Sequence, residues 1–142
     1  MKTTQSQSEL LFESKKAKIY LNPETCTLEL MWTKNADKED YKSVSYKGLE
    51  LLKEYRLANW LSGIKNNDVI DDELSLWLQE EIIPRAVSYG LKKVAIVMEK
   101  DAFDKYYSNF IYNNSERTGI EYLQFFDTKD KADAWLLSNH KL

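Results

Sequence analysis

The 142-residue sequence contains few of the residues that most often build catalytic sites. Its one cysteine, Cys26, cannot form an intramolecular disulfide and has no neighbouring histidine or basic cluster to activate it. Its one histidine, His140, lies beside Lys141 in a terminal segment of a kind that is usually mobile. Both positions argue against Ser/His/Asp and Cys/His catalysis.

Glycine is also scarce, with four residues that stand alone: Gly48, Gly63, Gly90 and Gly119. They form neither a Walker motif nor a dinucleotide-binding fingerprint, which argues against nucleotide-dependent catalysis. Adjacent acids occur at Asp71–Glu73 and Glu80–Glu81, but their spacing is not that of a calcium loop, and such acids are commonly solvated. We therefore predict no catalytic residue, no metal and no cofactor.

No apolar run approaches the ~18 residues that a membrane-spanning helix needs. Residues 1–8 are polar and lack the apolar centre of a secretory signal, so a cytoplasmic location is expected. The 20 Lys and Arg residues are interleaved with 23 Asp and Glu residues, which leaves no basic stripe for nucleic acid. The length predicts a single domain over residues 1–142, with about the first nine residues loose.

Aromatic residues, in contrast, make up 13% of the sequence, enough to fill a core, line a pocket or form a dimer surface. Core packing is the favoured interpretation, with Trp77 and Trp135 as anchors. A homodimer is a further expectation, because small aromatic-rich domains often bury surplus apolar area in this way.

The N-terminal third predicts an antiparallel hairpin. Residues 10–13 and 17–21 have extended character, residues 22–25 supply turn chemistry, and residues 27–32 alternate apolar and polar side chains. We expect a strand at 27–32 with one face on the core. The alternation places Leu28, Leu30 and Trp32 on that face, and Thr27, Glu29 and Met31 on the other.

A helix follows, with Asp37 as its N-cap, Asp40 three residues later and an end near Arg56. Gly48 falls on the packed face, where the missing Cβ allows the helix to approach the sheet closely. We therefore predict that Gly48→Leu destabilises the protein.

The remaining sequence alternates strands and helices. A helix from Asp71 or Asp72 is interrupted at Pro84, where a kink or break is expected. Strands are predicted at 57–62, 91–98 and 120–126, and further helices from Asp101 and Asp127. Together these elements predict an α/β fold with a mixed, mainly parallel sheet of about five strands, an N-terminal hairpin and about four flanking helices.

In open sheets of this kind, ligands usually meet the loops at the carboxyl ends of the parallel strands, here 62–68, 99–101 and 127–129. Plain connections are the alternative interpretation of these loops. The candidate residues for a ligand or partner are Ser62, Lys65, Asn66, Asn67, Asp68, Glu99 and Asp101.

Five short segments carry a family resemblance: Trp77–Leu78, Pro84–Val87, Gly90–Val97, Phe125–Asp127 and Ala134–Leu136. They resemble the SpoIIAA-like family, relatives of the STAS domain, and most closely its uncharacterised single-domain members in Bacteroidetes. The resemblance covers roughly residues 58–137 and implies a SpoIIAA-like fold with a mainly parallel sheet.

Known relatives in that family include anti-sigma-factor antagonists, which switch partners when a serine is phosphorylated, and the fold is also similar to lipid-binding Sec14-type domains. The signalling branch carries Asp-Ser-Ser-Gly where this sequence has Leu61-Ser62-Gly63-Ile64. Closer relatives often have an Asp followed by an Arg where Gly63 and Lys65 stand here.

Three functions follow from these observations. The first is a non-enzymatic binding or regulatory module for a protein partner or a small apolar ligand. The second is a phosphorylation-responsive regulator with Ser62 or Ser75 as the phosphosite, although the acids at 71–73 would oppose a phosphate. The third is a carboxylate-based hydrolase, which needs paired acids with separated pKa values, drawn from Asp68, Asp71, Asp72 and Glu99.

Overall fold

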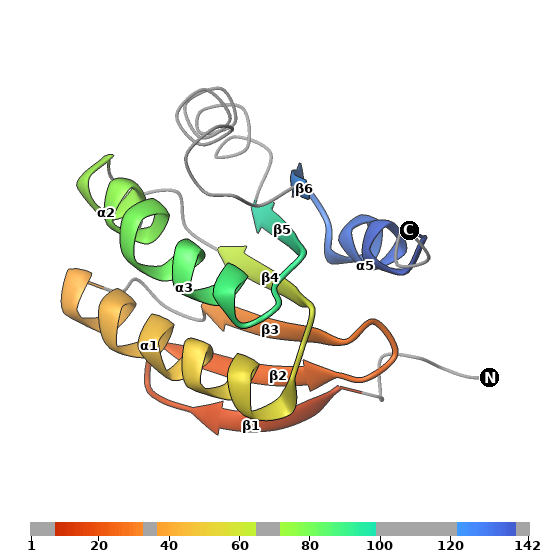
Figure 1. Cartoon of the computed structure of the whole chain (residues 1–142), viewed down its shortest axis with the longest axis horizontal. Coiled ribbons are helices and arrows are strands. Elements are labelled where there is room, and N and C mark those ends of the chain that lie inside the picture. The colour runs from red at the N-terminus through yellow and green to blue at the C-terminus, as the bar shows by residue number, and fades with distance from the viewer. Residues whose placement is uncertain (1–7, 33–36, 65–71, 99–121, 139–142) are drawn as a thin grey trace.

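The computed structural model describes residues 8–32, 37–64, 72–98 and 122–138. These residues form a mixed six-stranded sheet in the order β1-β2-β3-β4-β5-β6, which confirms the predicted α/β class. The first three strands are antiparallel and the last four run parallel to one another (Figure 1). The strands are β1 Glu9–Glu13, β2 Ala17–Asn22, β3 Thr27–Trp32, β4 Asn59–Ile64, β5 Lys93–Met98 and β6 Tyr122–Phe126.

The sheet has one strand more than predicted because a serine turn separates β1 from β2. The backbone N–H of Ser14 donates to the carbonyl of Ala17 at 2.9 Å. In return, the Ser14 hydroxyl accepts from the backbone N–H of Ala17 at 3.3 Å. This local turn reverses the chain, so Glu9–Glu13 pairs along β2 as a strand of its own.

Helix α1 (Lys38–Tyr55) begins and ends as predicted. The Asp37 carboxylate accepts from the backbone N–H of Asp40 at 2.9 Å, and the Asp40 carboxylate accepts from that of Asp37 at 3.1 Å. This reciprocal capping box satisfies two backbone donors of the first turn. The helix ends at Arg56, which adopts a left-handed conformation with φ 55°.

The second helical segment continues past Pro84 without a break. Helix α2 (Asp72–Trp77) passes through the π-helical turn η2 (Leu78–Ile82) into α3 (Ile83–Ser88). In the wider turn the N–H of Ile83 donates to the carbonyl of Leu78, and Pro84 lies in the first turn of α3, where its missing N–H is tolerated. The predicted interruption therefore takes the form of a π turn.

The last helix, α5 (Lys129–Ser138), has its cap one residue later than predicted. The Thr128 hydroxyl accepts from the backbone N–H of Lys131 at 3.3 Å, so Thr128 supplies the cap in place of Asp127. The predicted helix from Asp101 lies outside the described residues. Among the described helices, none is long and apolar enough to cross a membrane.

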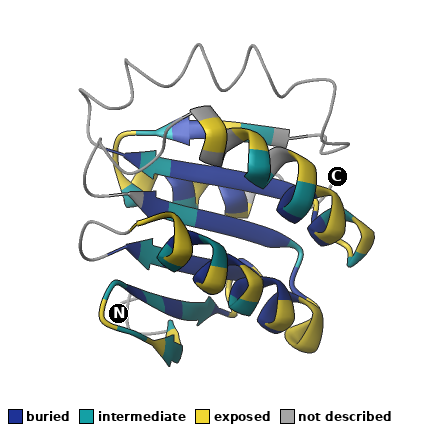
Figure 2. Cartoon of the chain, turned by 90° about the vertical axis from the view of Figure 1, so that its left-hand side faces the viewer, coloured by how far each residue is buried: buried dark blue, intermediate teal, exposed yellow. Residues whose placement is uncertain are grey.

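Helices cover both faces of the sheet. Helices α1 and α2–α3 pack on one face over the larger core, and α5 packs on the other over a smaller cluster (Figures 1 and 2). The expectation that β3 has only one face on the core is therefore wrong. Because α5 covers its second face, Thr27 and Glu29 are buried as completely as Leu28.

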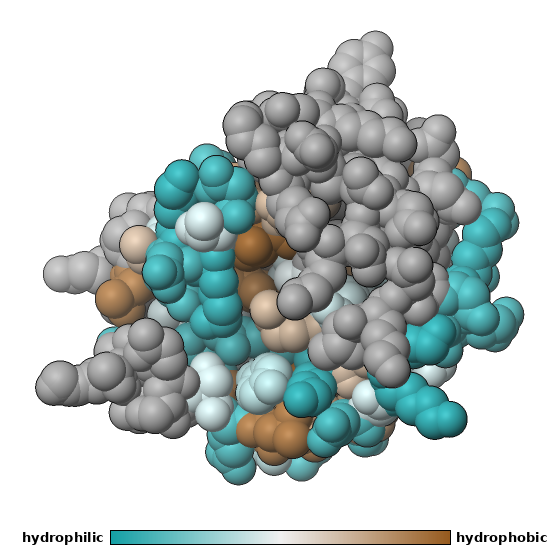
Figure 3. Space-filling view, turned by 180° about the vertical axis from the view of Figure 1, so that it is seen from behind, coloured by the Kyte–Doolittle hydropathy of each residue, from teal (hydrophilic) through white to brown (hydrophobic). Residues whose placement is uncertain are grey.

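The buried tryptophans are not the two that the sequence suggested. Trp32 and Trp60 are 2% and 8% exposed, because they extend from the sheet into the layer under the helices. Trp77 and Trp135 are only partly buried at the margins of the two clusters. Seen from behind, the described surface is mostly hydrophilic, with apolar side chains in small groups near the middle, at the lower edge and at the left of the view (Figure 3).

Candidate functional site

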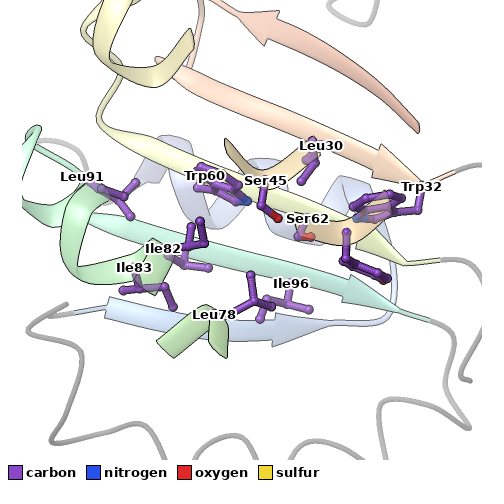
Figure 4. A pocket seen from close by; sticks show the side chains of 13 residues that line it. Leu30, Trp32, Ser45, Trp60, Ser62, Leu78, Ile82, Ile83, Leu91 and Ile96 are labelled. Atoms are coloured by element: carbon purple, nitrogen blue, oxygen red, sulfur yellow. The ribbon is translucent and has the colours of Figure 1, made fainter. Parts of the chain in front are cut away.

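An apolar chamber of about 60 Å³ lies between the sheet and its two covering helices. The side chains in Figure 4 reach into this space from both layers. The sheet contributes Leu30, Trp32, Trp60, Ser62, Val94 and Ile96. The helices contribute Tyr41, Ser45, Leu78, Ile82, Ile83 and Ala86, and Leu91 closes the ring just before β5.

Strand register explains the sheet side of the apolar chamber. Ser62 of β4 lies opposite Leu30 of β3 and Ile96 of β5, so these three side chains form one row across the sheet. Trp60 and Val94 belong to the neighbouring row, two residues back along their strands. Because side chains alternate between faces along a strand, both rows point to the same helical layer.

The helix side depends on the π turn. Leu78 and Ile82 are the first and last residues of η2, and both line the chamber. The wider turn places them beside Ile83 and Ala86 of α3 on one face of the helical segment. π turns within α-helices are frequent at functional sites.

Side-chain contacts hold the two covering helices together. The Tyr46 hydroxyl of α1 donates to the Glu81 carboxylate of η2 at 3.0 Å, and this hydrogen bond raises the pKa of Tyr46. Lys38 of α1 forms an ion pair with Glu73 of α2. The Tyr46 ring also meets Trp77 edge-on, with 5.6 Å between ring centroids. The apolar chamber therefore has a helical cover whose two parts are connected.

Five lining residues carry polar groups among the apolar walls. They are the hydroxyls of Tyr41, Ser45 and Ser62 and the indole N–H groups of Trp32 and Trp60. The Trp32 ring packs on Tyr41 with 4.2 Å between centroids, and its buried Nε1 has no hydrogen-bond acceptor among the described residues. None of the lining residues is charged.

Of the predicted site residues, Ser62 is the one that the structure describes, and it belongs to β4, not to a loop. The strand continues through Gly63, which pairs with Met31 of β3 and Val97 of β5, and the missing Cβ leaves room for the Met31 side chain, whose Cε lies 2.6 Å from that position. The other predicted site residues lie outside the described residues: Lys65, Asn66, Asn67, Asp68, Glu99 and Asp101.

The opposite face of the sheet carries a buried polar cluster that the sequence did not reveal. Glu29 is 1% exposed, and its carboxylate accepts from Asn22 at 3.0 Å and from Ser8 at 3.2 Å. Lys129 of α5 lies 3.1 Å from Glu29 and 2.8 Å from Asp133. A hollow of about 180 Å³ adjoins this cluster. The pair of Lys129 with Glu29 joins α5 to the sheet, and the pair with Asp133 lies within α5.

Lys93 is a second buried cation on this face. Its Nζ donates to the carbonyl of Leu136 at 2.8 Å and lies 5.4 Å from the ring centre of Trp135. The Leu136 carbonyl belongs to the last turn of α5, where backbone acceptors lack helical partners. Lys93 therefore caps α5 from the sheet.

Burial and charge shift the pKa values of this cluster in different directions. Burial raises the pKa of Asp133 and outweighs the hydrogen bond from Lys129. Burial alone would lower the pKa of Lys129, but the carboxylates of Asp133 and Glu29 raise it. Burial, together with the charges of Glu29 and Asp130, keeps the pKa of Asp133 from the lowered value typical of an ion pair. For Lys93, burial lowers the pKa.

A charged residue within an alternating strand was the one sequence signal for this cluster. Glu29 stands between Leu28 and Leu30, and its face was expected to meet solvent. Only the position of α5 shows that it needs Lys129 as a counter-charge. Among the described residues, no group of three His, Cys, Asp or Glu side chains is arranged to hold a metal.

Comparisons with protein-family models, with curated proteins and with solved structures found no match to this chain.

Proposed function

We propose that the protein is a non-enzymatic binding module that holds a small, uncharged, apolar molecule in the apolar chamber between α1, α2–α3 and the sheet. The observation that carries the proposal is the lining of this chamber, which combines aliphatic and aromatic walls with a few uncharged polar groups, three hydroxyls and two indole N–H groups. Binding sites for small molecules typically have such mostly apolar walls with a few polar groups that fix orientation.

The size and polarity of the chamber restrict the ligand. A volume of about 60 Å³ accommodates a molecule of a few heavy atoms unless the walls move. A charged ligand would lose its hydration without meeting a counter-charge among the lining residues, which is energetically costly. The proposal therefore favours neutral compounds.

The exposed surface gives less support to a protein partner. Among the described residues, the large exposed apolar side chains come from four different elements, and single residues of this kind are normal on protein surfaces. They are Leu10 on β1, Tyr46 and Tyr55 on α1, Leu76 on α2 and Leu137 on α5.

We also propose that the fold is of the SpoIIAA-like type. An N-terminal antiparallel segment followed by four parallel strands agrees with the mainly parallel sheet that the resemblance implies. A solved structure of this protein, compared with members of that family, tests this part of the proposal.

Xenon is a suitable first probe because apolar cavities bind it without a hydrogen bond. We expect saturable xenon binding in ¹²⁹Xe NMR, with shifted amide signals from residues around Ile96 and Ala86. Ala86→Val should abolish the binding by filling the chamber that Ala86 lines. Ala134→Val adds the same volume at an exposed position of α5 and should leave it unchanged. Absence of saturable binding in the wild-type protein contradicts the proposal.

A further inference from the structure

Trp32 is the most unusual group in the wall of the apolar chamber. It ends β3, is 2% exposed and packs on Tyr41, yet its indole Nε1 has no acceptor among the described residues. Buried N–H groups in native proteins nearly always have a partner, either a protein group or a bound molecule. An indole donor of a lining residue that has no partner among the described residues therefore indicates an acceptor that those residues do not supply.

The remaining walls determine what kind of molecule can supply this acceptor. Apart from Trp32, the polar groups of the lining residues are the hydroxyls of Tyr41, Ser45 and Ser62 and the indole N–H of Trp60, and the rest of the wall is apolar. A carboxylate or phosphate would find an N–H donor here but no cation to balance its charge. A neutral carbonyl or ether oxygen needs no such balance.

We propose that the ligand is a small neutral molecule with an apolar body and one oxygen acceptor, such as a ketone or an ether, which accepts a hydrogen bond from Trp32 Nε1. This inference rests on the proposed function, because it concerns the same chamber. It adds the ligand class and the residue that orients it. The apolar body lies against the row formed by Leu30 and Ile96, and the oxygen faces the end of β3.

Two probes of nearly equal shape test the inference. Cyclobutanone carries a carbonyl oxygen where methylenecyclobutane carries a CH₂ group, so they differ mainly in the acceptor. We expect the ratio of their affinities, measured by NMR titration, to shift toward the hydrocarbon at least fivefold in Trp32→Phe, which keeps an aromatic ring and loses the N–H. Trp135→Phe removes an indole N–H on the opposite face of the sheet, outside the chamber, and should leave the ratio within twofold.

A measurement on the wild-type protein covers the case in which a variant does not fold. The indole proton signal of Trp32 should move downfield with cyclobutanone and much less with methylenecyclobutane. If both probes bind and neither the ratio nor this signal distinguishes them, the inference is wrong and the proposed function stands. If the indole proton contacts a bound water that cyclobutanone does not displace, the inference is also wrong. If neither probe binds, and xenon does not bind either, both proposals fail.

Discussion

The ring of Trp60 lies directly above Gly48, and a Cβ added to Gly48 would come within 2.8 Å of the Cη2 atom of Trp60. Leu28 approaches the same position to 3.4 Å. Helix α1 therefore lies close to the sheet at the one residue that has no side chain. Trp60 also lines the apolar chamber, so the close packing of α1 and the wall of the candidate site share this ring.

Gly48→Leu should lower the free energy of unfolding by about 1–3 kcal/mol or more, because overpacking forces Trp60 and α1 apart. The improved helix propensity, about 1 kcal/mol relative to glycine, offsets only part of this loss. Chemical denaturation provides the measurement. Glu54→Leu, at an exposed position of the same helix, is the matched control and should change stability little. A Gly48→Leu protein as stable as wild type would show that the contact is not maintained.

Trp60→Ala should cost about 3–5 kcal/mol, the range for deleting a large buried aromatic side chain. Trp135→Ala should cost about half as much, because Trp135 remains partly exposed beside Phe126. Equilibrium unfolding in urea compares the two variants under the same conditions. The reverse order of the two losses would contradict the burial described above.

Lys129→Met should destabilise the protein by about 2–3 kcal/mol, since it leaves the Glu29 carboxylate buried without its cation. The loss stays below that of a fully buried pair because solvent reaches part of the Lys129 side chain. Lys131→Met is the matched control on the same helix, where the exposed pair with Asp127 contributes about 0–1 kcal/mol. Equal losses of unfolding free energy in the two variants would mean that the buried Glu29 carboxylate does not need Lys129 as its counter-charge.

The pKa of Asp133 is raised above the ordinary value of 3.8, so the folded state binds this proton more tightly than the unfolded state. The contribution of Asp133 to stability is therefore fully present below pH 3.8 and is lost as the pH rises through the raised value. The difference in unfolding free energy between wild type and Asp133→Asn should fall with increasing pH across this window. Urea titrations at a series of pH values measure this difference in unfolding free energy. A difference that rises with pH would contradict a raised pKa of Asp133.

Ser62→Asp should destabilise the protein by about 2 kcal/mol or more at neutral pH, because a carboxylate there enters an uncharged chamber. Protonation at low pH should restore part of the loss. Ser62→Ala keeps the small size without the charge and should cost less than about 1 kcal/mol. If Ser62→Asp is as stable as wild type and loses a partner, a phosphorylation-responsive regulator becomes the better proposal.

The sequence by itself determined the local features that depend on neighbours in the chain. The capping box of Asp37 and Asp40, the close packing at Gly48 and the succession of strands and helices could all be predicted, because caps, periodicity and turn residues act over a few positions. The same reasoning ended the strand at Ser62 and began a loop there, because Gly63 resembles a strand end, whereas β4 continues to Ile64.

Only the tertiary structure decided which faces are buried and what meets in space. The second face of β3 is covered by α5, so Glu29 and Lys129 form an ion pair across 100 residues of sequence that no periodicity connects. In the same way, Trp32, Ser62 and Leu78 come from three separate segments and line one chamber because strand register and a π turn bring them together. Pairing across a sheet and packing between layers are long-range events, and the pattern of a single strand or helix does not encode its partner.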